Sequence, residues 1–194
     1  MPREIEIKLR VEDLGAVRWR LGRLGFRRVT ARLLERNLVL DTVERRLRGS
    51  GQLLRLRSVG SRWWLTYKGP TELGARHKIR EEREIETGDG TTLGEILGQL
   101  GYGPVFEYQK YRTEYRRAGS RGKVLVDETP IGNYVELEGA AGWIDRTARE
   151  MGYGPPDYIL ESYGNLYLAW CRERGVAPAH MVFGGKKSLL GPAG

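Results

Sequence analysis

Charged and apolar residues alternate strictly at the start of the chain. Glu4, Glu6 and Lys8 share one parity, and isoleucine and leucine residues occupy the other. Successive side chains of a strand point to opposite faces, so this spacing predicts a strand over residues 2–11 with one charged and one apolar face.

Comparable runs recur along the chain and are separated by turns that contain Gly or Ser. They predict seven more strands, over residues 33–41, 52–58, 62–68, 77–86, 105–117, 123–127 and 134–138. Eight antiparallel strands are enough to close a sheet into a barrel.

Four helices are predicted between and after the strands. Asp13 is a capping residue ahead of apolar residues at helical spacing. Thr92 and Glu95 form a capping-box pattern for a second helix. A third helix is expected over residues 143–151, and Ser162 is expected to cap a fourth.

The charged residues of the strands keep to one parity in strand after strand. Beyond the first strand these residues are Arg55, Arg57, Lys68, Arg80, Glu82, Glu84, Lys110, Arg112, Asp127, Glu136 and Glu138. A solvated sheet face explains one such strand, but the repetition predicts a closed sheet lined with acid and base. The predicted fold class is therefore α+β, an eight-stranded antiparallel closed β-barrel with a charged interior and flanking helices.

Carboxylates stand in like-charged pairs at i, i+2 spacing. The pairs are Glu4 with Glu6, Glu82 with Glu84, and Glu136 with Glu138. Each pair is repulsive unless a positive group lies between its members. Mg²⁺ and Mn²⁺ bind through carboxylates, waters and substrate phosphates, whereas Arg and Lys bind phosphate oxygens. The rows therefore predict a site for a divalent metal and a highly charged anion.

The positive net charge favours an anionic partner, and the length and composition of the chain predict one domain followed by a tail. The chain has 194 residues and a net charge of +8, which does not choose between nucleic acid, a membrane surface and small phosphates. Residues 1–175 are predicted to form one domain. Residues 176–194, rich in Gly, Pro and Lys, are predicted to be a mobile tail, in which 179–183 is interpreted as a tether rather than a lid.

Cysteine and histidine are too scarce for several kinds of site. Cys171 is the single cysteine, and His77 and His180 are the two histidines, which excludes an internal disulfide and a Cys- or His-based metal site. His77 borders a predicted loop and is expected to be solvated. No apolar run has the length of a membrane span and no signal peptide is recognised, so the expected location is cytoplasmic, with no membrane partner.

Several short motifs follow one another in order from residue 4 to about residue 170. The first is Glu4-Ile5-Glu6-Ile7-Lys8, with the pattern E-x-E-x-K. The others are segments 49–57, 65–70, 80–84 (R-x-E-x-E), 110–112 (K-x-R), 127–138 and Ser162-Tyr163. Together they resemble the motifs of the CYTH superfamily, the triphosphate tunnel metalloenzymes, which include class IV adenylate cyclase, thiamine triphosphatase and inorganic triphosphatases.

The resemblance implies a tunnel that holds a triphosphate together with Mg²⁺ or Mn²⁺. It implies metal ligands at Glu4, Glu6, Glu136 and Glu138. Glu82, Glu84 and Asp127 would complete the acidic side, holding a second metal or orienting a water. Phosphate oxygens would be bound by Lys8, Arg55, Arg57, Lys68, Arg80, Lys110 and Arg112. Lys78 shares the row but is a weaker candidate, because a lysine at a strand end is often solvated.

The sequence leaves the reaction open between three functions. The preferred function is hydrolysis of inorganic, thiamine or nucleoside triphosphate, because a tunnel that grips only the triphosphate needs no base-reading pocket. The alternative is an adenylate cyclase that converts ATP to cyclic AMP and pyrophosphate. A non-catalytic polyphosphate- or RNA-binding module is disfavoured, because paired carboxylates repel nucleic acid and Trp63 and Trp64 are interpreted as packing under an outer helix. The sequence leaves a homodimer open.

Overall fold

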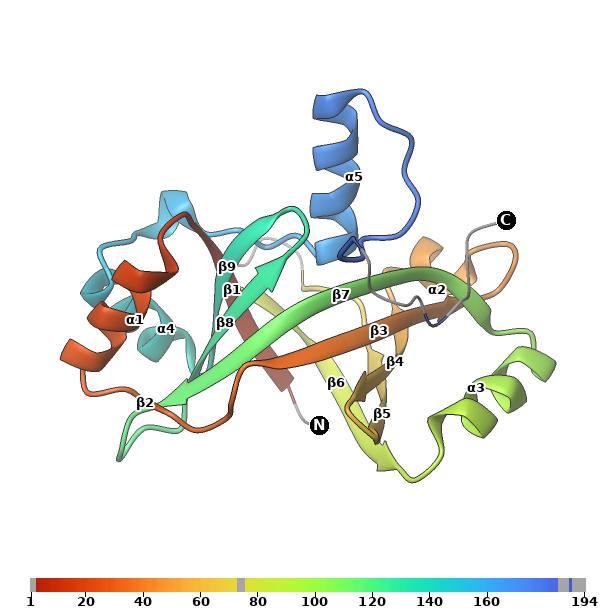
Figure 1. Ribbon diagram of the computed structural model, residues 1–194, viewed down its shortest axis with the longest axis horizontal. Coiled ribbons are helices and arrows are strands. Elements are labelled where there is room, and N and C mark those ends of the chain that lie inside the picture. The colour runs from red at the N-terminus through yellow and green to blue at the C-terminus, as the bar shows by residue number, and fades with distance from the viewer. Residues whose placement is uncertain (1–2, 73–75, 185–188, 190–194) are drawn as a thin grey trace.

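Eight antiparallel strands close into a barrel in the computed structural model, which describes residues 3–72, 76–184 and 189 (Figure 1). The order around the barrel is β7-β3-β4-β5-β6-β1-β9-β8, and β8 pairs with β7 to complete the ring. The bounds are β1 Arg3–Val11, β3 Leu33–Asp41, β4 Leu53–Val59, β5 Arg62–Lys68, β6 Lys78–Thr87, β7 Gly103–Arg116, β8 Lys123–Thr129 and β9 Gly132–Glu138. The predicted fold class is confirmed.

The structure also contains three short elements of secondary structure that were not predicted. Strand β2 (Arg27–Arg28) pairs with the end of β7, and α2 (Arg46–Gly49) is a single turn between β3 and β4. A 3₁₀ turn, η1 (Pro155–Asp157), precedes the last helix. These segments are too short to carry a period of two or of 3.6 residues, and so they have no hydrophobic pattern in the sequence.

The apolar residues of the strands point away from the barrel interior and form the main hydrophobic core between the barrel and its helices. Helices α1 (Leu14–Arg23) and α4 (Ala141–Glu150) cover β1, β8 and β9 at one end of the molecule (Figure 1). Ile7 and Leu137 from the strands and Leu21 and Ile144 from the helices are fully buried there. Because the apolar residues of β1 and β9 face these helices, the charged residues of the same strands face the interior.

A third helix, α3 (Gly90–Gln99), packs on β5. Its cap is Asp89, whose carboxylate accepts hydrogen bonds from the backbone N–H groups of Thr91 and Thr92 at 3.0 Å. The predicted cap at Thr92 is therefore wrong by one turn. A Cβ atom on Gly90 would lie 2.1 Å from the ring of Trp63, so this tryptophan packs closely under the helix, as predicted.

Helix α5 (Tyr163–Arg174) stands over one end of the barrel, and the chain after it turns back toward β7 (Figure 1). Ser162 caps α5 as predicted, by accepting a hydrogen bond from the Asn165 N–H. Met181 is 1% exposed in a second core cluster with residues of α5 and β7. It is thus packed where composition predicted a mobile tail; the domain division stays a prediction, and 185–188 and 190–194 lie outside the described residues.

None of the described helices is long and apolar enough to span a membrane.

Candidate functional site

A cavity of about 1420 Å³ runs through the barrel and is lined by the charged parity of the strands. Of the residues predicted for the site, those that line the cavity are Glu4, Glu6, Lys8, Arg55, Arg57, Lys68, Arg80, Glu82, Glu84, Lys110, Arg112, Glu136 and Glu138. Asp127 is fully buried beneath the lining. Lys78, the weaker candidate of the same row, also lines the cavity and is 5% exposed.

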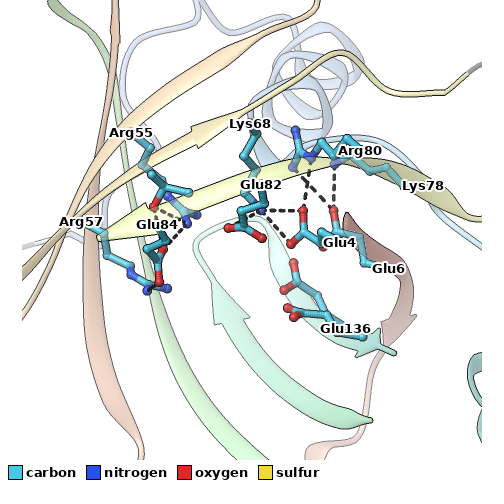
Figure 2. A network of polar contacts seen from close by, with 12 residues as sticks. Glu4, Glu6, Arg55, Arg57, Lys68, Lys78, Arg80, Glu82, Glu84 and Glu136 are labelled. Carbon is cyan, nitrogen blue, oxygen red and sulfur yellow. Dashed lines mark hydrogen bonds and ion pairs between the residues drawn. The ribbon is translucent and has the colours of Figure 1, made fainter. Parts of the chain in front are cut away.

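The first cluster joins β1, β5 and β6 around Glu4. Lys68 Nζ lies 2.7 Å from Glu4 Oε1 and 3.3 Å from Glu82 Oε1, and Arg80 Nε donates to Glu4 at 3.2 Å (Figure 2). Burial and the neighbouring Glu6 oppose ionisation of Glu4, but Lys68 and Arg80 outweigh them and lower its pKa. Glu82 behaves differently, because burial raises its pKa.

The second cluster surrounds Glu6, which is 4% exposed. Lys78 Nζ lies 2.9 Å and Lys8 Nζ 3.3 Å from its carboxylate, and Lys8 also lies 3.3 Å from Glu136. Burial opposes ionisation of Glu6, but the lysines hold its pKa well below the usual range. Burial and the adjacent Lys8 lower the pKa of Lys78 to about 8, although Glu6 acts in the opposite direction.

The third cluster is centred on Asp127. Lys110 Nζ donates to its carboxylate at 2.8 Å, Arg112 donates with two nitrogens at 2.7 and 2.6 Å, and the Tyr163 hydroxyl donates at 2.8 Å. Arg112 also donates to Glu136. With this many donors, Asp127 fixes the positions of two cations that line the cavity.

The fourth cluster joins charged residues of β3, β4 and β6. Figure 2 draws Glu84 between the side chains of Arg55 and Arg57, at distances of 3.6 and 2.9 Å. Arg57 also lies 3.6 Å from Glu35. Burial opposes ionisation of Glu35, but arginines and Lys110 nearby lower its pKa to about 2.

Glu4, Glu6 and Glu138 form a group that could hold a metal ion. One carboxylate oxygen from each lies within 4.8 Å of the others. Burial, together with Glu136 and Glu4, raises the pKa of Glu138 even though Lys123 lies 2.6 Å away. Hard divalent cations bind carboxylate oxygens, and a positive charge here would relieve the repulsion. The donor set therefore fits such an ion.

Glu136 also lines the cavity, but it does not belong to the group of Glu4, Glu6 and Glu138. Its carboxylate contacts Lys8 at 3.3 Å and accepts from Arg112. Two cations rather than two acids are its nearest charged partners. Three of the four predicted metal ligands are thus brought together.

Sequence reasoning missed several polar residues of the barrel. The sequence did not single out Glu35, because the other residues on its side of β3 include Leu33, Asn37 and Val39 and so do not form a charged row. Tyr108, whose hydroxyl accepts from Arg55 at 3.1 Å, looks in the sequence like any core tyrosine. His77 is 7% exposed and lies 2.8 Å from Asp145 outside the cavity, so the expectation that it is solvated is wrong.

Comparison with known proteins finds similar sequences and similar structures. A protein of Methanocaldococcus jannaschii is 29% identical over 135 residues, which cover 70% of this chain and 75% of that protein. A structure from Vibrio parahaemolyticus is 18% identical with a TM-score of 0.74, covering 84% of this chain and 96% of the other. Both are named "putative adenylate cyclase".

A Hippeastrum protein described as having a dominant triphosphatase activity superposes with a TM-score of 0.63 at 20% identity, over 90% of this chain and 97% of that one. The family model described as the CYTH domain matches residues 2–163. That range contains every strand of the barrel and every carboxylate and cation of the four clusters. The chain therefore belongs to the CYTH domain family.

Proposed function

We propose that this chain is a divalent-metal-dependent enzyme that acts on a triphosphate, and that its reaction is hydrolysis. The observation that carries the proposal is the cavity inside the barrel, in which a trio of carboxylates adjoins a wall of lysines and arginines. Such a lining is complementary to a polyanion that arrives with a divalent cation, and it is poorly suited to any neutral ligand.

Each charged group has a proposed role. Glu4, Glu6 and Glu138 hold Mg²⁺ or Mn²⁺, and Glu136 takes part by keeping Lys8 and Arg112 in place. The metal, when bound, neutralises charge on the phosphates and orients them. The phosphate oxygens are bound by Lys8, Arg55, Arg57, Lys68, Arg80, Lys110 and Arg112, which are already held in position by acidic partners.

Two further acids remain for the attacking water. Glu82 has a raised pKa and lines the cavity 3.3 Å from Lys68, which suits a group that accepts a proton during the attack. Glu84 accepts a hydrogen bond from Thr66 at 2.6 Å and so has a fixed orientation. Asp127 acts as a positioning residue, because Lys110, Arg112 and Tyr163 all donate to it and it does not line the cavity.

Adenylate cyclase is the second candidate. The names of the Methanocaldococcus jannaschii and Vibrio parahaemolyticus proteins support it, and the activity described for the Hippeastrum protein supports hydrolysis. Both reactions use the same electrostatics, because a nucleophilic oxygen attacks phosphorus in line while cations neutralise the charge. They differ in which phosphorus is attacked.

A panel of substrates separates the candidates. The purified chain is incubated with Mg²⁺ or Mn²⁺ and with tripolyphosphate, thiamine triphosphate or ATP, and orthophosphate and cyclic AMP are both measured. We expect orthophosphate release that EDTA abolishes. Cyclic AMP from ATP with little orthophosphate from any substrate would favour the cyclase. Tight RNA binding without metal and without phosphate release would favour a binding module.

A further inference from the structure

A second, smaller pocket lies beside the barrel, between the loop that joins β7 to β8 and the start of α4. Figure 1 shows both segments at the end of the molecule where α1 and α4 lie. The volume of the pocket is about 260 Å³, which is below the roughly 300–1,000 Å³ of most pockets for organic ligands and suits a small ion. Arg117, Arg121 and Arg146 line it, and none of the described residues that line it is an Asp or a Glu.

Two of these three arginines have no charged partner. Arg117 donates to the Glu150 carboxylate at 3.1 Å, whereas neither Arg121 nor Arg146 is hydrogen-bonded or ion-paired to any other residue that the structure describes. One exposed, unpaired arginine is ordinary, but two that line the same pocket place their positive charge around one space. A guanidinium group binds the oxygens of a phosphate through parallel N–H donors, so the pocket is suited to such an anion.

The N-terminus of α4 adds backbone donors at the same place. Ala140, the residue that precedes the helix, lines the pocket, and no side chain caps the helix there. The first N–H groups of a helix have no partner within the helix, and they carry the positive end of its dipole. A phosphate group is a favourable ligand for such N–H groups.

Trp143 independently indicates a missing acceptor. This residue is 9% exposed and lines the pocket, and its Nε1–H has no hydrogen-bond partner in the part of the chain that the structure describes. A buried donor that lacks an acceptor is unfavourable and requires an explanation. An anion held against the indole would supply the acceptor.

Hydrogen bonds and packing fix the shape of the loop over this pocket. The Ser120 N–H donates to the Arg117 carbonyl at 3.1 Å and closes a turn, and the Gly122 N–H donates to the Ser120 hydroxyl at 3.2 Å. A Cβ atom on Gly122 would lie 2.4 Å from the ring of Trp143, so the loop rests directly on the indole. The positions of the backbone on both sides of the pocket are therefore set before any ligand binds.

The pocket adjoins the cavity of the barrel. Arg121 and Ala140 line both spaces. Lys123 follows Arg121 by two residues and pairs with Glu138 across β8 and β9, and Ala140 follows Glu138 by two residues. The pocket thus lies next to one of the proposed metal ligands but outside the four charged clusters.

We propose that this pocket is a second phosphate site, which binds inorganic orthophosphate through Arg121, Arg146 and the N-terminus of α4. The inference goes beyond the proposed function, because the pocket needs neither a metal ion nor a triphosphate in the barrel. Orthophosphate is also the product of the proposed hydrolysis. When the barrel releases it, the pocket offers it a binding site at the edge of the cavity.

NMR titrations of the metal-free chain with orthophosphate, at constant ionic strength, test the site. The readout is the indole N–H signal of Trp143, which is assigned from its loss in Trp143→Phe. We expect orthophosphate to shift this signal saturably, and Arg146→Gln to weaken the dissociation constant by about fivefold, as for an exposed ion pair. Arg149→Gln is the matched control, because Arg149 is exposed on the same helix but does not line the pocket; it should change the constant by less than about twofold.

Ala140→Asp tests the contribution of the helix N-terminus. Ala140 has the extended backbone of an N-cap residue, so an aspartate there can accept hydrogen bonds from the first N–H groups of α4 and repel an anion. It should abolish the phosphate-dependent shift of the Trp143 signal without lowering the melting temperature. Arg57→Ala, which removes a cation inside the barrel, should leave that shift unchanged.

The outcomes separate this inference from the proposed function. A Trp143 signal that does not respond to orthophosphate, or a response that Arg146→Gln and Ala140→Asp leave unchanged, would overturn the inference alone. Loss of the response in Arg57→Ala would show that phosphate acts from inside the barrel, and would also overturn it. A chain that binds orthophosphate at this pocket but hydrolyses no triphosphate leaves the inference standing and removes only the proposed reaction.

Discussion

Replacing Glu35 by glutamine tests whether charge pairing inside the barrel stabilises the fold. This carboxylate is 6% exposed, and Arg57, Lys110 and Arg112 surround it at 3.6–3.9 Å. Its pKa falls from 4.5 to about 2 on folding, which corresponds to about 3 kcal/mol at 1.36 kcal/mol per pKa unit. Because the folded pKa lies below the unfolded one, this stability is present above pH 4.5 and is lost as the pH falls toward 2.

Urea-induced unfolding of the native chain and of Glu35→Gln should therefore differ by about 3 kcal/mol at pH 7, and the difference should fall to about half near pH 3. Glu44→Gln is the control, because Glu44 is exposed and pairs only loosely with Arg46 at 3.5 Å; its effect should be at most about 1 kcal/mol. A loss in Glu35→Gln no larger than in the control, or a difference that does not change with pH, would refute the reasoning.

Three other substitutions have outcomes fixed by the structure. Gly90→Ala places a Cβ 2.1 Å from the ring of Trp63 and should cost about 1–3 kcal/mol in thermal unfolding, whereas Gly98→Ala in the same helix meets nothing within 4 Å and should be neutral or stabilising. Arg57→Ala should raise KM for tripolyphosphate, and unchanged kinetics would place this arginine outside the site. Glu138→Gln should weaken Mn²⁺ binding, measured by calorimetry, without lowering the melting temperature, because burial already raises the pKa of Glu138 and makes its charge unfavourable; undiminished Mn²⁺ affinity would contradict the metal assignment.

The strands and the charged residues that face the barrel interior could be predicted, because in every strand alternate residues face the same side. Glu4, Glu6 and Lys8 follow this rule without interruption, and so do Glu136 and Glu138. Parity places these side chains on one face, but it does not give the register between strands. For this reason the sequence treats Glu136 and Glu138 alike as predicted metal ligands. The register of β1 and β9 sets Glu138 directly opposite Glu6 and Glu136 opposite Lys8.

The features that the sequence did not predict depend on contacts between segments that are far apart in the chain. Lys78 was a weaker candidate because it lies at the end of its strand, but it pairs with Glu6 across β1 and β6 and is buried inside the barrel. Phe106 of β7 stacks on Tyr167 of α5, whose hydroxyl accepts a hydrogen bond from the Ala179 N–H. No sequence pattern connects three segments so far apart.

The most direct test of the central claim is a crystal structure of the chain with Mn²⁺ and tripolyphosphate, recorded with the anomalous signal of manganese. We expect an anomalous peak among the carboxylates of Glu4, Glu6 and Glu138, and a triphosphate inside the barrel against Lys8 and Arg55. A triphosphate bound by arginines on the outer surface, with no manganese among those carboxylates, would contradict the account.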